Sequence, residues 1–251
     1  MTQLSQLALS VQLPDDETFD SFIGQPNHSV LVQLTSFIRQ NKVETEQHEN
    51  HSLALFSQLP HSFYLFGLAG VGKSHLLHAC NNLAAQLKKT SVCLSCSELK
   101  QLPIGVLDGL EQIDFICLDD IELIAGDVQW QQAIFDLYNR AIENESCLII
   151  TGSEAINKLG ITLPDLVSRI GWGYIEQVKP LDDDDKTLAI QHRARQRGLM
   201  ISDEATRFLL NRSSRDMTSL IQTLDILDKA SIREQRKVTI PFIKEILNIS
   251  S

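Results

Sequence analysis

The sequence contains a glycine-rich loop whose residue types suit the binding of phosphate. Residues 67–74 read Gly-Leu-Ala-Gly-Val-Gly-Lys-Ser and match the pattern G-x-x-x-x-G-K-[ST] at every position. The glycines let backbone N–H groups point inward as an anion nest, and the dipole of a following helix adds to the attraction. Lys73 would supply a positive charge at the outer phosphates, and Ser74 a hydroxyl for Mg²⁺. The loop therefore predicts a nucleotide site.

Two carboxylates follow an apolar run further along the chain. Residues 115–120 read Phe-Ile-Cys-Leu-Asp-Asp, as expected of a strand that ends in acids beside the phosphate loop. Asp119 would hold Mg²⁺ through water, and Asp120 could polarise the water that attacks the last phosphate. The next apolar run ends near Ser153 and Thr151, either of which could sense that phosphate.

These residues need a scaffold that alternates strands with helices, and the apolar pattern supplies one. We expect helices at 29–40, 73–88 and 128–143, and strands at 62–66, 91–95, 113–118, 147–151 and 174–178. Strands that alternate with helices favour a parallel sheet covered on both faces. The predicted fold class is therefore α/β, a P-loop NTPase core around a five-stranded parallel sheet.

The pattern changes near Pro180, after which only helices are predicted. These run at about 183–197, 202–212, 216–233 and 239–247. The acidic run at 182–185 starts the first of these helices. We interpret it as complementing the helix dipole rather than as a metal-binding cluster. We therefore predict an extended tail at 1–14, an α/β nucleotide-binding domain at 15–180 and a small all-helical domain at 181–251.

The composition is that of a globular protein and disfavours several functions. Apolar residues make up 43% of the chain, charged residues 22%, and the net charge is −10. DNA binding rewards clustered Lys and Arg, and no basic stripe is visible, so direct DNA binding as the main task is disfavoured. No apolar run is long enough to span a membrane and no leader is recognised, so we expect a cytoplasmic location. The C-x-x-C formed by Cys93 and Cys96 is expected to hold buried thiols rather than zinc.

Four short segments together resemble the AAA+ core of the bacterial replication initiator DnaA. They are residues 18–23 (TFDSFI), 72–78 (GKSHLLH), 118–121 (LDDI) and 168–173 (SRIGWG), of which the last is the most specific. The resemblance covers roughly residues 15–249, and the chain is similar to the DnaA/Hda family of AAA+ proteins. It implies that the helical part is a lid domain. It also implies an adenine nucleotide, ADP in preference to ATP, together with Mg²⁺.

The resemblance further implies which residues hold this nucleotide. Asp120 stands where the family usually has the longer Glu, and Thr218 where it usually has a sensor arginine. Arg215, one helical turn earlier, could replace that arginine. Ser74 and Asp119 would be the metal ligands. The implied nucleotide-binding residues are Phe22, Ile23, Gly67, Ala69, Gly70, Val71, Gly72, Lys73, Ser74, His75, Asp119, Ser153 and Arg215.

The segment 168–173 implies that Arg169 acts on another molecule. In AAA+ assemblies an arginine at this turn reaches the nucleotide of the neighbouring subunit. Its guanidinium neutralises charge that develops on the γ-phosphate. The resemblance implies that Arg169 reaches ATP bound to DnaA, in trans. The alternative is a surface arginine that forms a capping salt bridge.

The first residues of the chain suggest a second partner. Residues 6–11 (QLALSV) resemble the short peptide by which replication proteins bind the β sliding clamp of DNA polymerase III. Gln6 could form hydrogen bonds while Leu7, Leu9 and Val11 enter apolar pockets from an extended chain. The closing Ser-Val pair is smaller than the usual closing residues, which would weaken the affinity.

The expected function follows from this combination, together with the lack of any stretch similar to the helix-turn-helix DNA-binding domain of DnaA. Hda-type members of the family are nucleotide-bound regulators that link the clamp to DnaA, stimulate hydrolysis of DnaA-bound ATP and prevent re-initiation. We expect weak or no ATPase activity of the chain alone, DNA association through the clamp, no membrane and a possible homo-oligomer. The alternatives are an autonomous AAA+ ATPase of the clamp-loader or remodelling type, a truncated DNA-binding initiator and a P-loop small-molecule kinase.

Overall fold

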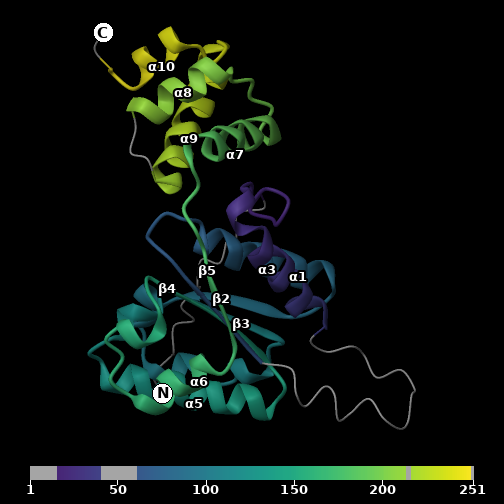
Figure 1. Cartoon of the computed structure of the whole chain (residues 1–251), viewed down its shortest axis with the longest axis vertical. Coiled ribbons are helices and arrows are strands. Elements are labelled where there is room, and N and C mark those ends of the chain that lie inside the picture. The colour runs from purple at the N-terminus through teal and green to yellow at the C-terminus, as the bar shows by residue number, and fades with distance from the viewer. Residues whose placement is uncertain (1–15, 41–60, 213–215, 250–251) are drawn as a thin grey trace, which may run out of the picture.

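The first part of the chain is built on a five-stranded parallel sheet (Figure 1). The computed structural model describes residues 16–40, 61–212 and 216–249. The strand order is β2-β3-β4-β1-β5, which confirms the predicted α/β class and parallel sheet. The strands are β1 (Ser62–Phe66), β2 (Ser91–Ser95), β3 (Phe115–Asp119), β4 (Cys147–Gly152) and β5 (Tyr174–Gln177).

Helices cover both faces of this sheet, as Figure 1 shows. The main ones are α1 (His28–Gln40), α3 (Lys73–Gln86), α5 (Val128–Glu143) and α6 (Pro164–Gly171). Successive side chains of a strand point to opposite faces. Phe63 and Leu65 of β1 therefore pack with α1 and α3, whereas Tyr64 packs with α5 and α6. All three side chains are fully buried, as expected for a strand covered on both faces.

Short helical turns complete the connections of the α/β part. They are η1 (Gln25–Asn27), α4 (Cys96–Leu99), η2 (Ile104–Leu107), η3 (Leu110–Gln112), η4 (Ile121–Ile124) and η5 (Ile156–Lys158). Strand β3 begins at Phe115, two residues later than predicted, because η3 and a turn occupy the preceding positions. None of the helices in the described part of the chain is long and apolar enough to cross a membrane.

Four helices form a separate cluster at the C-terminal end (Figure 1). They are α7 (Asp183–Gln196), α8 (Asp203–Arg212), α9 (Met217–Glu234) and α10 (Ile240–Ile246). Leu224, Leu227 and Phe242 are fully buried in their common core. The side chain of Asp182 caps α7 by accepting a hydrogen bond of 2.8 Å from the backbone N–H of Asp185. The helical pattern predicted after Pro180 is thereby confirmed.

The segment before α1 lies between the sheet domain and the helical lid (Figure 1). Asn27 ties it to the connection that leads into the lid: its Nδ2 donates to the carbonyl of Lys179 at 2.9 Å, and its Oδ1 accepts from the Lys179 N–H at 2.8 Å. Gly24 approaches Leu181 so closely that an added Cβ would lie 2.2 Å from its Cδ2. Phe22 of the same segment lies beside Gly72, so the segment contacts both the glycine-rich loop and the connection into the lid.

Candidate functional site

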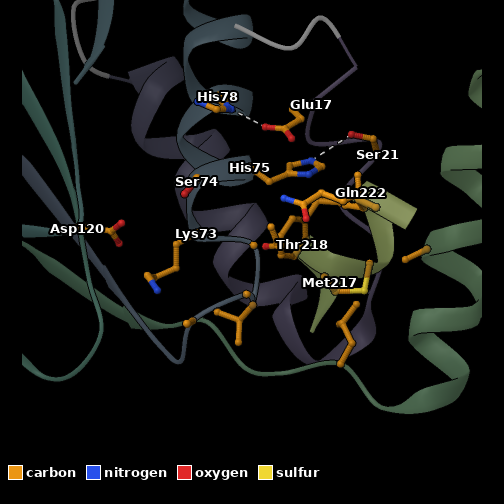
Figure 2. A pocket seen from close by; sticks show the side chains of 18 of the residues that line it. Glu17, Ser21, Lys73, Ser74, His75, His78, Asp120, Met217, Thr218 and Gln222 are labelled. Atoms are coloured by element: carbon orange, nitrogen blue, oxygen red, sulfur yellow. Dashed lines mark hydrogen bonds and ion pairs between the residues drawn. The ribbon is translucent and has the colours of Figure 1, made fainter. Parts of the chain in front are cut away.

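A cavity of about 470 Å³ lies where the glycine-rich loop, the N-terminal segment and the lid meet (Figure 2). Eleven of the sequence-predicted residues line it together. They are Phe22, Ile23, Ala69, Gly70, Val71, Gly72, Lys73, Ser74, His75, Asp120 and Ser153. Residues from distant parts of the sequence thus meet in one cavity of a size that suits a small cofactor.

The loop between β1 and α3 has a conformation that requires glycine. Gly70 has a φ of 75° and Gly72 a φ of 98°, both in the left-handed region. An added Cβ on Gly72 would lie 2.7 Å from Cε2 of Phe22, and one on Gly70 would lie 2.9 Å from Cβ of Asp216. Helix α3 begins directly after Gly72, so its free N–H groups and dipole face the loop. This is a cradle for a phosphate group.

Lys73 is the buried cation of this cradle. Its side chain is 7% exposed, and its Nζ donates to the carbonyls of Gly67 at 2.9 Å and Leu68 at 3.2 Å. An ammonium has three N–H donors, so one remains for an anion. Gly67 does not line the cavity, but its backbone holds the loop through this bond and through a 3.2 Å bond from its N–H to the carbonyl of Gly152.

The two strand-end carboxylates have different positions. Asp120 lines the cavity, whereas Asp119 does not and instead accepts a hydrogen bond from Oγ1 of Thr151. The same Oγ1 accepts from the N–H of Asp120 at 2.9 Å. Thr151 is therefore committed to the strand ends, and Ser153 is the candidate sensor that reaches the cavity. Asp120 adopts a φ of 57°, an uncommon left-handed conformation that turns the chain at this point.

The carboxylate of Asp120 lies in an acidic environment. Burial raises the pKa of Asp120, and the nearby charges of Asp119 and Glu122 add to this effect, while the charge of Lys73 opposes it. Glu122 also lines the cavity, and its Oε2 has no hydrogen-bond partner among the described residues. A cation that binds beside a phosphate would relieve this repulsion. No group of three or more His, Cys, Asp or Glu in the described ranges could hold a metal, so Ser74 and Asp119 would need phosphate oxygens to complete an Mg²⁺ site.

A network of charged residues closes the cavity on the side of the lid and was not anticipated from the sequence. Arg193 of α7 is 5% exposed, and its Nη2 lies 3.0 Å from Oδ1 of Asp16 and 3.5 Å from Oε1 of Glu17. Glu17 also contacts Nδ1 of His78 at 2.5 Å (Figure 2). Burial alone would raise the pKa of Glu17, but the hydrogen bond to His78 and the charges of His75, His78 and Arg193 hold it below its usual range.

His75 connects the same network to the loop. Its Nε2 lies 3.1 Å from Oγ of Ser21 (Figure 2) and 3.0 Å from the carbonyl of Thr18. Its ring contacts the ring of Phe22 edge to face. Burial lowers the pKa of His75, outweighing the carbonyl of Thr18 and the charge of Glu17. His75 is half-buried, and its contacts with Ser21, Thr18 and Phe22 hold the N-terminal segment against α3.

The lining of the cavity combines polar and apolar groups. Lys73, Ser74 and the loop N–H groups supply the polar contacts that suit phosphates. Apolar side chains from the N-terminal segment and the lid supply surface for a purine ring. They are Phe22, Ile23, Leu181, Ala189, Met217 and Ile221. The residues present therefore fit an adenine nucleotide. The lid residue Thr218 lines the cavity, whereas Arg215 lies outside the described residues.

Arg169 lies apart from this cavity. It belongs to α6, which packs with α5 on the face of the sheet opposite to α3 (Figure 1). It is half-buried and not among the residues that line the cavity. Its Cζ lies 5.4 Å from the centre of the Trp172 ring. The clamp-peptide candidates Gln6, Leu7, Leu9 and Val11 lie outside the described residues.

Comparisons with known proteins agree with this architecture. Residues 183–247 match the family model described as "Hda, lid domain". Domain III of the replication initiation protein DnaA from Thermotoga maritima is similar with a TM-score of 0.75 and 17% identity, over 94% of this chain and 97% of that chain. AMPPCP-bound DnaA from Aquifex aeolicus is similar with a TM-score of 0.66 and 20% identity, over 90% of this chain and 71% of that chain. The RuvB Holliday junction branch migration motor of Thermotoga maritima is similar with a TM-score of 0.64 and 16% identity, over 94% of this chain and 72% of that chain. The fold of the chain is therefore similar to the folds of DnaA and RuvB, and residues 183–247 match a lid domain of the Hda type.

Proposed function

We propose that this protein is a nucleotide-bound regulator of replication initiation that stimulates hydrolysis of ATP bound to DnaA. The single observation that carries the proposal is the position of Arg169. It lies outside the chain's own cavity, on the opposite face of the sheet, beside an exposed tryptophan. An arginine placed there serves a phosphate that another molecule brings. The lid of the Hda type and the DnaA-like fold support DnaA as that molecule.

The chain's own nucleotide would have a structural task. Lys73, Ser74 and the loop N–H groups would hold its phosphates, and Asp119 and Ser74 would hold Mg²⁺, which neutralises phosphate charge when bound. The lid approaches the cavity with Thr218 where the family has an arginine, and Arg193 is already paired with Asp16 and Glu17. Among the described residues of the lid, no unpaired arginine lines the cavity, and this supports ADP as the resting ligand and little ATP hydrolysis by the chain alone.

Arg169 would act by electrostatic stabilisation. Charge builds up on the transferred phosphoryl group during hydrolysis, and a guanidinium that meets it lowers the barrier. The proton and the attacking water would be handled in the partner's own site. A clamp bound to residues 6–11 would hold the protein on DNA, so that its action on DnaA begins once DNA carries the clamp and re-initiation is prevented.

A single-turnover assay tests this proposal. DnaA loaded with radiolabelled ATP is mixed with wild-type protein, Arg169→Ala or Arg207→Ala, each with and without clamp-loaded DNA. Arg207 is an exposed arginine of α8 paired with Asp184, so its variant controls for the loss of one surface charge. We expect the Arg169→Ala protein to lose on the order of 10³-fold or more in stimulated rate. We expect Arg207→Ala to behave as wild type, and stimulation to require the clamp.

Two outcomes would contradict the proposal in different ways. Equal stimulation by wild-type and Arg169→Ala protein would remove the role of Arg169. Substantial ATP turnover by the chain alone would instead favour an autonomous ATPase, for which Lys73 and Asp120 in one cavity are the supporting observation.

A further inference from the structure

An exposed tryptophan accompanies Arg169 at the end of α6. Trp172 is the C-cap residue of this helix, and its side chain is 72% exposed. A single exposed apolar residue is ordinary and by itself indicates nothing. The contact is informative, because the guanidinium carbon of Arg169 lies 5.4 Å from the centre of the indole ring. This is within the range of a cation–π interaction, for which indole is the best aromatic partner.

The backbone of Arg169 is fixed from the interior. The hydroxyl of buried Tyr138 donates to the carbonyl of Arg169 at 2.8 Å, and Oγ of Ser62 lies 2.8 Å from the same hydroxyl. An added Cβ on Gly173 would lie 2.2 Å from Oγ of Ser62, so the turn after α6 packs directly on the start of β1. The peptide that carries Arg169 therefore has little freedom to move.

Among the described residues, the ring of Trp172 is the anchor that the side chain of Arg169 contacts. No carboxylate among residues 16–40, 61–212 and 216–249 forms an ion pair with it. A long arginine side chain loses rotamer entropy when it is ordered, and that loss weakens any interaction for which it must first be ordered. A flat indole face beside the guanidinium restricts these rotamers before a partner arrives.

We propose that Trp172 is a positioning residue that holds the guanidinium of Arg169 ready for the phosphates of a partner's nucleotide. The inference rests on the proposed function of Arg169 and deepens it. Ordering the arginine in advance brings the cation close to its transition-state position. Loss of the ring lowers the rate in the complex, and not only the affinity of the complex.

If Trp172 only contributed to binding DnaA, its loss would change a different kinetic parameter. Exposed aromatic residues often anchor protein interfaces, and their loss then weakens association. An anchor changes the protein concentration that gives half of the maximal stimulation. A positioning residue changes the plateau rate at saturation. The two roles therefore separate in a titration.

The experiment titrates DnaA loaded with radiolabelled ATP, in the presence of clamp-loaded DNA, with wild-type protein and with variants at position 172. We expect Trp172→Leu to lower the plateau rate about two- to fivefold, as loss of a cation–π contact predicts, and Trp172→Phe to recover most of it. Met200→Ala, which removes a 76%-exposed apolar side chain of the lid, should leave both parameters unchanged. ADP affinity measured by calorimetry should be the same for all of these proteins, which verifies folding.

The outcomes separate the inference from the function on which it rests. A full plateau for Trp172→Leu, or a change confined to the half-saturating concentration, overturns the positioning role. If Arg169→Ala also keeps the full plateau, the proposed function itself fails. The NMR signal of the Arg169 Nε–H gives a readout without DnaA, because the ring current of the indole should shift it in wild type and not in Trp172→Leu. Identical shifts in the two proteins would overturn the inference independently.

Discussion

The nucleotide cavity and the Arg169 turn place their positive charges in opposite ways. In the cavity the ammonium of Lys73 bonds to loop carbonyls, and the guanidinium of Arg193 pairs with Asp16. Both cations are almost fully buried. At the turn, Arg169 is half-buried and contacts the face of Trp172, with no ion-pair partner among the described residues.

The two regions therefore differ in whether the chain itself provides the partners of the cation. A buried charge without partners is expensive, so the chain supplies partners for the cations around the cavity. A cation at the surface keeps its hydration and needs no internal partner, and it can be given to an anion from outside. The first region is organised to retain a ligand, and the second to meet one.

The largest effect that tests this comparison concerns Lys73. Replacing Lys73 by alanine removes the buried cation of the phosphate cradle and should weaken ADP binding by about 2–5 kcal/mol, on the order of 30- to 5,000-fold. Arg169→Ala should bind ADP as wild type does, because Arg169 does not line the cavity. Isothermal titration calorimetry measures both. Lys158→Ala removes an exposed lysine and serves as the control.

Two results would break the comparison. Wild-type affinity in the Lys73→Ala protein would mean that the cradle does not hold the phosphates. Equal weakening in the Arg169→Ala protein would mean that the two regions are not separate.

The sequence was most informative where one local motif determines both backbone and chemistry. The loop at 67–74 needs left-handed glycines, and Gly70 and Gly72 adopt that conformation. Strands β1, β3 and β4 were found because they are buried on both faces and therefore read as apolar runs. Glycine spacing and apolar runs are properties of neighbouring residues, so they are visible without a structure.

The sequence was least informative where the site depends on distant contacts. Nothing local marks Arg193 as a partner of Asp16 and Glu17, which lie far away in the chain and meet it only when the lid folds over the cavity. The choice between Thr151 and Ser153 also depended on the register of β3 against β4, which places the Thr151 hydroxyl on the strand-end carboxylates. Such contacts are set by packing between elements.

The second-largest expected effect concerns Gly72, the N-cap residue of α3. Gly72→Ala combines a left-handed φ of 98° with a Cβ placed 2.7 Å from Phe22, whereas Gly109→Ala has a similar φ of 85° and open space around the added Cβ. Both should lose about 1–2 kcal/mol of unfolding free energy from the backbone alone. Only Gly72→Ala should also displace Phe22 and weaken ADP binding. Urea unfolding and calorimetry together measure this. Equal ADP affinity in the two variants would show that Phe22 does not shape the cavity.

The smallest expected effect concerns Glu17, which contacts both α3 and the lid helix α7. The pKa of Glu17 is held below its ordinary value of 4.5. As the pH falls, the carboxylate of Glu17 therefore becomes protonated at a lower pH in the folded protein than in the unfolded chain. The stabilisation is complete above pH 4.5 and is lost as the pH falls through the lower, folded value. Glu17→Gln should cost about 1 kcal/mol at pH 7 through the altered contacts with His78 and Arg193. It should also flatten the fall in unfolding free energy below pH 4.5.

His75 provides an internal reference in the same experiment. Its pKa lies below the ordinary 6.5, so the unfolded chain takes up that proton first and stability falls as the pH drops below 6.5. Glu17→Gln should therefore change the pH profile of urea unfolding mainly below pH 4.5 and keep the decline that begins at 6.5. A variant whose profile matches wild type below pH 4.5 would show that Glu17 is not held charged by its partners. The lid side of the cavity would then lack the internal pairing that distinguishes it from the Arg169 turn.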